Sequence, residues 1–258
     1  ANGRLKMEML PDGAVVAAFE IVDAVDKGVV DGGYAWTHYW SGKNTAAGLF
    51  SNPAAGGGTG MNCYACKGGN GTASRLVPFG SRTFTVAAFV QANFGARAEL
   101  TVAGRPVGAQ LLDDNPLDGD WFERDLAFAP PGAGSVIAIV ATDAPLLPGQ
   151  CKALARRVPL GLARTGTTGS HFSGDIFLAF STADVPGLAS EFPLGPVTDD
   201  ELGTLSFVPW GRMDALYTAV VQSVEEAVLN ALVVNTDMVG RDGHRSPRLP
   251  LDRLSALL

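Results

Sequence analysis

One short run of residues limits the possible folds more than any other part of this chain. Residues 135–142 read SVIAIVAT, which is too apolar for a strand with one face in water. Such β-branched runs are typical of a central strand buried on both faces of a sheet. Similar short runs alternate with helical periodicity and are separated by many of the 32 glycines and 16 prolines. The sequence therefore predicts an α/β protein.

The flanking segments predict further elements from their apolar spacing. Strands are expected over 82–92, 98–107 and 173–182, and helices over 14–30, 147–158 and 213–235. The first two strands can pair as a hairpin, because the second turns back at Ala103-Gly104. The Gly-rich segment 56–71 predicts an ordered loop, and the acidic, proline-bearing segment 108–131 predicts an exposed connection.

The charge balance excludes some classes of partner. Asp and Glu number 26 against 19 Lys and Arg, a formal charge of −7, which disfavours nucleic acid and anionic membranes. The sequence has no apolar run of about 18 residues, and its start does not resemble a signal peptide. These features predict a cytoplasmic protein with no membrane partner.

The cysteines raise the question of a metal or redox site. Cys63 and Cys66 form a single C-x-x-C, which can be half of a zinc site or a redox pair. A structural zinc site needs four ligands, and the remaining candidates have no ligand spacing. These candidates are Cys151, His38, His171 and His244. We therefore expect reduced thiols, no metal and no cofactor.

Ser135 is the first residue of the central apolar run, directly after the sequence PPGAG at 130–134. A glycine at 134 would let the preceding peptide adopt backbone angles that a residue with a Cβ resists. Cleavage there would free an α-amino group of pKa about 7.7 to 8.0, which can accept the serine hydroxyl proton. From the residues alone, a self-cleaving nucleophile and an ordinary turn serine are both open.

A family resemblance favours the first alternative. The segment GSVIAIVATDAPLLPGQCKALARR at 134–157 resembles the start of the β-chain in the DmpA-type L-aminopeptidase/D-esterases and β-peptidyl aminopeptidases. Further blocks resemble that family in the same order, at 56–75, 89–95, 159–166, 172–184 and 225–244. The resemblance implies an α/β fold, an αββα sandwich of the N-terminal-nucleophile type, truncated and altered at its N-terminal side. It also implies an α-chain-like part at 54–134 and a β-chain-like part at 135–258.

The resemblance implies roles for four residues. Ser135 would be the nucleophile and the new N-terminus, formed by autoproteolysis of the Gly134–Ser135 bond. Ser173 and Asp175 would be the second active-site serine and its acidic partner. Asn93 would donate its side-chain amide to the oxyanion of the tetrahedral intermediate. The implied substrates are small peptides, amides and esters, and the implied assembly is a homo-oligomer.

Other functions remain open at this stage. A Ser-His-Asp triad using His171 is disfavoured because the chain has no G-x-S-x-G elbow, and adjacent residues of a strand point differently. An acyltransferase can use the same covalent intermediate. A catalytically silent or small-molecule-binding chimera is the remaining alternative.

The chimera is suggested by residues 1–53. Residues 10–53 resemble an interior stretch of the TRAP-transporter substrate-binding proteins, although they cover only a minority of such a domain. Family groups that bind the substrate amine and complete the oxyanion hole cannot be assigned in this segment. We therefore expect simple esters to be the easiest substrates. Trp36, Tyr39 and Trp40 either line a replacement pocket or fill core space.

Overall fold

The computed structural model describes residues 58–113, 115, 134–183, 192, 195–197, 202–240 and 243–258. All of them belong to one compact unit, Pro53–Leu258. The predictions made for residues 1–53, including the helix at 14–30 and the aromatic cluster, lie outside the described residues. So does most of the expected connection at 108–131.

The described strands are β1 (Asn62–Cys63), β2 (Cys66–Lys67), β3 (Gly69–Phe79), β4 (Arg82–Asn93), β5 (Thr101–Val102), β6 (Arg105–Pro106), β7 (Ser135–Thr142), β8 (Ile176–Ser181), β9 (Met238–Val239) and β10 (Arg245–Ser246). The α-helices are α3 (Pro148–Ala155), α4 (Val158–Arg164), α5 (Asp214–Val233) and α6 (Leu251–Leu257), and the 3₁₀-helices are η4 (Arg97–Glu99), η5 (Gly108–Gln110) and η10 (Trp210–Arg212). No helix among these is both long enough and apolar enough to cross a bilayer.

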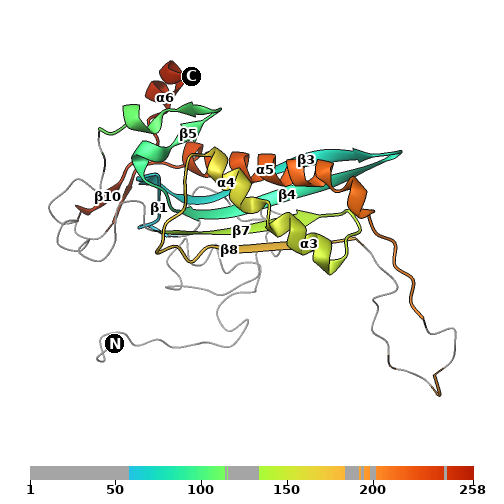
Figure 1. Ribbon diagram of the computed structural model, residues 1–258. Helices are drawn as coiled ribbons and strands as arrows, with labels where there is room; N and C mark the ends of the chain where they lie inside the picture. Colours follow the sequence, from blue (N-terminus) through green and yellow to red (C-terminus); the bar gives the residue numbers. More distant parts are fainter. Residues whose placement is uncertain are drawn as a thin grey trace, which may run out of the picture. The chain divides into compact units, whose positions relative to one another are not determined.

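The main sheet has four strands in the order β3-β4-β7-β8 (Figure 1). β4 pairs antiparallel with both β3 and β7, whereas β7 and β8 run parallel. The prediction of a central strand over 135–142 is therefore confirmed. The prediction that both of its faces are buried is wrong, because Val136, Ala138 and Val140 are buried while Ile137 is 38% exposed. In the described part of the chain, the helical layer covers only one face of the sheet.

The strand predictions on either side of Asn93 need correction. β4 confirms the strand expected at 82–92, but its hairpin partner is β3 rather than residues 98–107. Residues 98–107 form part of η4 and the short β5–β6 hairpin, which turns at Ala103 and Gly104 as predicted. Both turn residues have left-handed φ values, 49° and 76°.

The Gly-rich segment 56–71, expected to be an ordered loop, is partly strand where it is described. It contains β1, β2 and the beginning of β3. Its glycines allow close packing: a Cβ on Gly71 would lie 1.9 Å from the carbonyl oxygen of Ala227 in α5. The sequence of the segment does not reveal this role of Gly71, because the helix that it contacts is more than 150 residues away.

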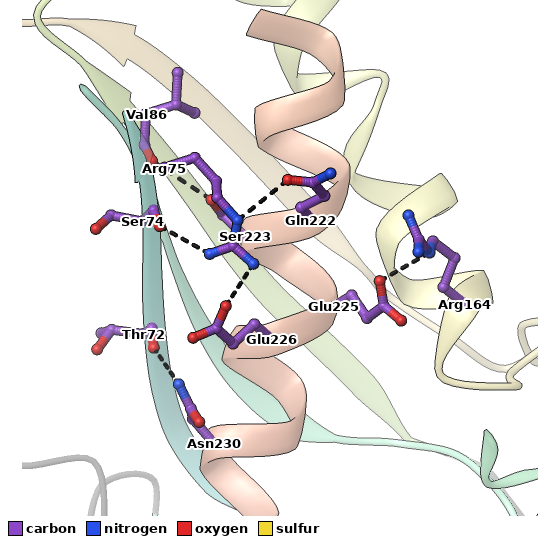
Figure 2. Close-up of polar contacts among 10 residues, drawn as sticks. All are labelled: Thr72, Ser74, Arg75, Val86, Arg164, Gln222, Ser223, Glu225, Glu226 and Asn230. Carbon is purple, nitrogen blue, oxygen red and sulfur yellow. Dashed lines mark hydrogen bonds and ion pairs between the residues drawn. The ribbon is translucent and has the colours of Figure 1, made fainter. Parts of the chain in front are cut away.

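Helix α5 confirms the amphipathic helix expected over 213–235. Its buried residues recur every three or four positions and pack on β3 and β4: Leu216, Ala219, Val220, Ser223, Val224, Ala227, Val228, Ala231 and Leu232. Polar contacts at its margins add to this packing (Figure 2). Arg75 on β3 pairs with Glu226 at 2.5 Å and donates to Gln222, and Asn230 donates to the carbonyl of Thr72. These contacts fix the helix along the sheet.

Two further elements differ from expectation in their extent. The helix expected at 147–158 ends at Ala155, and α4 begins at Val158 with Pro159 in its first turn. Proline has no N–H and its ring clashes with the preceding turn, so it begins a new helix instead of continuing α3. The strand expected at 173–182 is β8, which begins only at Ile176 and is exposed on one face.

Candidate active site

Ser135 and Asn93 lie opposite each other at the end of the central strand pair. Ser135 is the first residue of β7, Asn93 is the last of β4, and the two are in direct register. Both are half-buried. Directly opposed residues of an antiparallel pair project on the same side of the sheet. Their side is the one that also bears Ile137, the face without a helical layer.

The Gly134–Ser135 peptide lies tightly against the backbone of β4. A Cβ on Gly134 would be 2.0 Å from the carbonyl oxygen of Asn93, so no other residue fits there without a shift. Gly134 does not have a left-handed φ. A left-handed φ is therefore not the reason for glycine at this position, whereas the close approach to Asn93 is one.

The turn before β8 brings two more predicted residues to Ser135. The backbone N–H of Gly174 donates to Ser135 Oγ at 2.9 Å. Oδ1 of Asp175 accepts from the N–H of Val136 at 2.9 Å and from the hydroxyl of Ser173. Parallel pairing of β7 and β8 places this turn next to the start of β7. The four predicted residues are thus collected from three strand ends.

Asp175 itself is exposed. It precedes the first residue of β8 and is not part of an apolar strand. Its two hydrogen bonds come from a hydroxyl and a backbone N–H, which keep the carboxylate next to the Ser135–Val136 peptide without burial.

The amide of Asn93 is oriented by a residue that the sequence did not single out. Its Oδ1 accepts a hydrogen bond of 2.9 Å from the backbone N–H of Asn62. Because Oδ1 is the acceptor in that bond, the Nδ2 group remains the donor end of the side chain. No side-chain pattern could reveal this contact, since Asn62 contributes a backbone N–H from 31 positions away.

His171 does not form the arrangement of a triad with the nearby serine. Its ring packs edge-on against Phe172, with 4.6 Å between the ring centroids. The hydroxyl of Ser173 is bonded to Asp175 instead. This geometry does not support His171 as the base of a triad.

Cys63 and Cys66 face each other in register across β1 and β2, and both are buried. Burial, and to a lesser degree the neighbouring Cys66, raises the pKa of the Cys63 thiol far above its ordinary value. A neutral thiol is a poor nucleophile and a poor zinc ligand. Within the described ranges, no three residues of the types His, Cys, Asp and Glu gather as a metal site.

The four-stranded sheet with helices over one face has an α/β fold of the N-terminal-nucleophile hydrolase type, as its similarity to a solved structure shows. The l-aminopeptidase D-Ala-esterase/amidase of Ochrobactrum anthropi, described as a variant of that fold, matches with a TM-score of 0.64 and 43% identity. The match covers 79% of this chain and 51% of that one. A sequence profile of peptidase family S58 matches residues 11–246. The chain therefore belongs to peptidase family S58, and the predicted family and fold class are confirmed.

Other relatives agree with this assignment. The β-peptidyl aminopeptidase BapA of Sphingosinicella microcystinivorans is 39% identical over 219 residues, which are 84% of this chain and 53% of that protein. The β-aminopeptidase of Burkholderia sp. matches with a TM-score of 0.63 and 33% identity, over 96% of this chain and 71% of that one. The chain spans about half the length of the BapA protein.

The family profile also extends into the N-terminal segment. Its match begins at residue 11 and so includes most of residues 1–53, where the sequence suggested a TRAP-binding-protein fragment. The division of the chain into 1–53, 54–134 and 135–258 stays a prediction.

Proposed function

We propose that this chain is a serine N-terminal-nucleophile hydrolase of small peptides, amides and esters, matured by cleavage of the Gly134–Ser135 bond. The observation that carries the proposal is the position of Ser135. It lies on a central strand, accepts a hydrogen bond from Gly174 and has Asn93 directly opposite. Membership of peptidase family S58 and the aminopeptidase names of the relatives support the same chemistry.

In this scheme, the hydroxyl of Ser135 attacks the substrate carbonyl carbon and its proton passes to the neutral α-amine of the same residue. The side-chain Nδ2 of Asn93 donates to the oxyanion. Collapse of the tetrahedral intermediate breaks the bond to the leaving amine or alcohol, which takes the proton from the α-ammonium. Water then hydrolyses the acyl ester on Ser135 by the same steps in reverse.

Asp175 and Ser173 hold the start of β7 in this scheme. The carboxylate binds the N–H of Val136, one residue from the α-amine, and the hydroxyl of Ser173. A negative charge at that place stabilises the α-ammonium when it carries the proton. Esters have better leaving groups than amides, so we propose that simple esters are turned over faster than matched amides.

The first test combines the intact mass of the purified chain with turnover of a p-nitrophenyl ester and an aminoacyl p-nitroanilide. We expect two fragments that divide at Gly134–Ser135, and turnover of both substrates. Ser135→Ala should give an uncut chain without turnover. Ser74→Ala, an exposed serine of the same sheet, is the matched control and should be cut and active.

Other outcomes would contradict the proposal in distinct ways. Turnover that survives Ser135→Ala assigns the chemistry to another residue. A folded, uncut chain without turnover supports the catalytically silent alternative. Transfer of the acyl group to an added amine, in place of hydrolysis, identifies an acyltransferase with the same nucleophile.

A further inference from the structure

Lys67 is a buried cation close to the candidate site, and the mechanism above does not use it. Its side chain is 1% exposed. The ammonium donates to three backbone carbonyls, those of Gly58 at 3.1 Å, Met61 at 3.0 Å and Gly68 at 2.7 Å. Burial lowers the pKa of this ammonium, which reflects the cost of desolvating a charge. Three acceptors match its three N–H groups and offset that cost.

One of those carbonyls belongs to the peptide that holds Asn93. The carbonyl of Met61 accepts from Lys67 Nζ and from the N–H of Gly68 at 2.9 Å. The N–H of the same peptide unit, that of Asn62, donates to Asn93 Oδ1 at 2.9 Å. Lys67 and Asn93 are therefore bonded to opposite ends of a single planar peptide group.

Hydrogen bonds in series polarise one another, by about 10–30% per bond in condensed-phase estimates. A cation on the Met61 carbonyl makes the Asn62 N–H a stronger donor to Oδ1. A stronger bond at Oδ1 in turn withdraws electron density from the Asn93 amide, so that Nδ2 becomes a better donor. It also fixes the amide in the orientation that presents Nδ2 rather than Oδ1 as its available end.

We propose that Lys67 is a positioning residue that orients and polarises the Asn93 amide through the Met61–Asn62 peptide, so that Nδ2 binds the oxyanion. The inference rests on the proposed function, because it assigns Lys67 to the same acyl-transfer step. Its effect belongs to the transition state, since an oxyanion forms only there.

The surrounding packing keeps this arrangement rigid. A Cβ on Gly68 would lie 2.4 Å from the carbonyl oxygen of Ala92, so glycine lets β2 approach the end of β4. The N–H of Lys67 donates to the carbonyl of Pro247 at 2.6 Å, and the N–H of Tyr64 donates to that of Phe94 at 2.8 Å. The β1–β2 hairpin is therefore fixed on both sides of Asn93.

Arg97 supplies a matched control. It is 4% exposed, and its guanidinium also donates to three backbone carbonyls, those of Tyr64 and Leu111 at 2.9 Å and that of Ala65. None of these carbonyls belongs to the Met61–Asn62 peptide. Replacing Arg97, which lies in η4, thus removes a similar buried cation that is bonded to the turn of the same hairpin, without touching the connection to Asn93.

The test is a double-mutant cycle of Lys67→Met and Asn93→Ala, read as kcat and KM on the p-nitrophenyl ester. We expect Asn93→Ala to lower kcat by about 10²- to 10³-fold, as for other oxyanion donors. Lys67→Met should lower kcat about tenfold or more, with KM changed less than about threefold. The double variant should be no slower than Asn93→Ala alone, because Lys67 acts only through that amide. When Arg97→Met is combined with Asn93→Ala, kcat should fall by the product of the two single reductions, because the two residues act independently.

Two results would overturn the inference. If kcat of the double variant falls by the product of the two reductions seen in the single variants, Lys67 acts on stability or on another group. The proposed function survives that result. If Asn93→Ala keeps full kcat while Ser135→Ala abolishes it, Asn93 binds no oxyanion and Lys67 has nothing to polarise. If Lys67→Met does not fold, Lys67→Gln replaces it in the double-mutant cycle. This variant keeps N–H donors but has no charge, and the same comparison of kcat values applies.

Discussion

Gly134 is the residue of the site where an added side chain would be tolerated least. A Cβ there would meet the Asn93 carbonyl oxygen at 2.0 Å and its carbon at 3.0 Å, both of them backbone atoms. We expect Gly134→Ala to separate the start of β7 from β4 and to cost about 1–3 kcal/mol of unfolding free energy. Displacement of Ser135 from Asn93 should also lower turnover and formation of the two fragments at least tenfold. Urea unfolding, intact mass and ester turnover measure these effects.

The control for Gly134→Ala is Gly211→Ala, in η10. A Cβ on Gly211 would have no atom within 4 Å, and its φ is not left-handed. This substitution should change the unfolding free energy by no more than about 0.5 kcal/mol and leave turnover unchanged. If the two variants lose equal amounts of unfolding free energy and turnover, the close approach of Gly134 to Asn93 is not the reason for glycine at that position.

The residues of the site show how far sequence reasoning reaches. Ser135, Ser173, Asp175 and Asn93 are the residues that the family resemblance predicts, and the structure brings them together at the ends of β4, β7 and β8. Asn62 is not identified from the sequence, since it contributes only a backbone N–H and a backbone group has no sequence signature. Lys67 is not identified from the sequence for a related reason, because its partners are backbone carbonyls, which every residue possesses.

At the scale of elements, the contact of α5 with β3 depends on Gly71. A Cβ there would be 1.9 Å from the carbonyl oxygen of Ala227 and 2.7 Å from the nitrogen of Ala231. We expect Gly71→Ala to push the helix off the strand and destabilise the protein by about 1–3 kcal/mol or more, measured by urea unfolding. Ser74→Ala, an exposed change on the same strand, should stay within about 0.5 kcal/mol. A stable Gly71→Ala variant would show that the helix can shift at little cost.

Elements whose periodicity is local were predicted well, as α5 and β4 illustrate. Elements whose pairing is decided at long range were not. Residues 69–79 read as part of a glycine-rich loop followed by an unassigned segment, yet they form β3, because α5 covers one of its faces and β4 supplies its hydrogen bonds. Likewise, apolar content alone could not reveal that β7 and β8 are covered by helices on one face only.

In the described part of the molecule, the main sheet has two unlike faces. The helix-covered face contains the core, whereas the other face exposes apolar side chains: Leu76, Ile137, Ile176, Leu178 and Phe180. Apolar surface left in water stabilises little, whereas a cavity in a packed core costs the transfer free energy and the lost contacts. The same substitution should therefore have very different effects on the two faces.

Leu178→Ala and Leu232→Ala make that comparison with one chemical change. Leu178 is 52% exposed on β8, and Leu232 is fully buried in α5. We expect Leu232→Ala to cost about 2–5 kcal/mol and Leu178→Ala less than about 1 kcal/mol in urea unfolding. Leu178→Ala should also weaken binding of a hydrophobic dye such as ANS, because an exposed apolar patch is reduced. A loss of 2 kcal/mol or more at Leu178 would mean that another part of the protein covers this face. Since Ser135 and Asn93 lie on the same face, that cover would form a second wall of the candidate site.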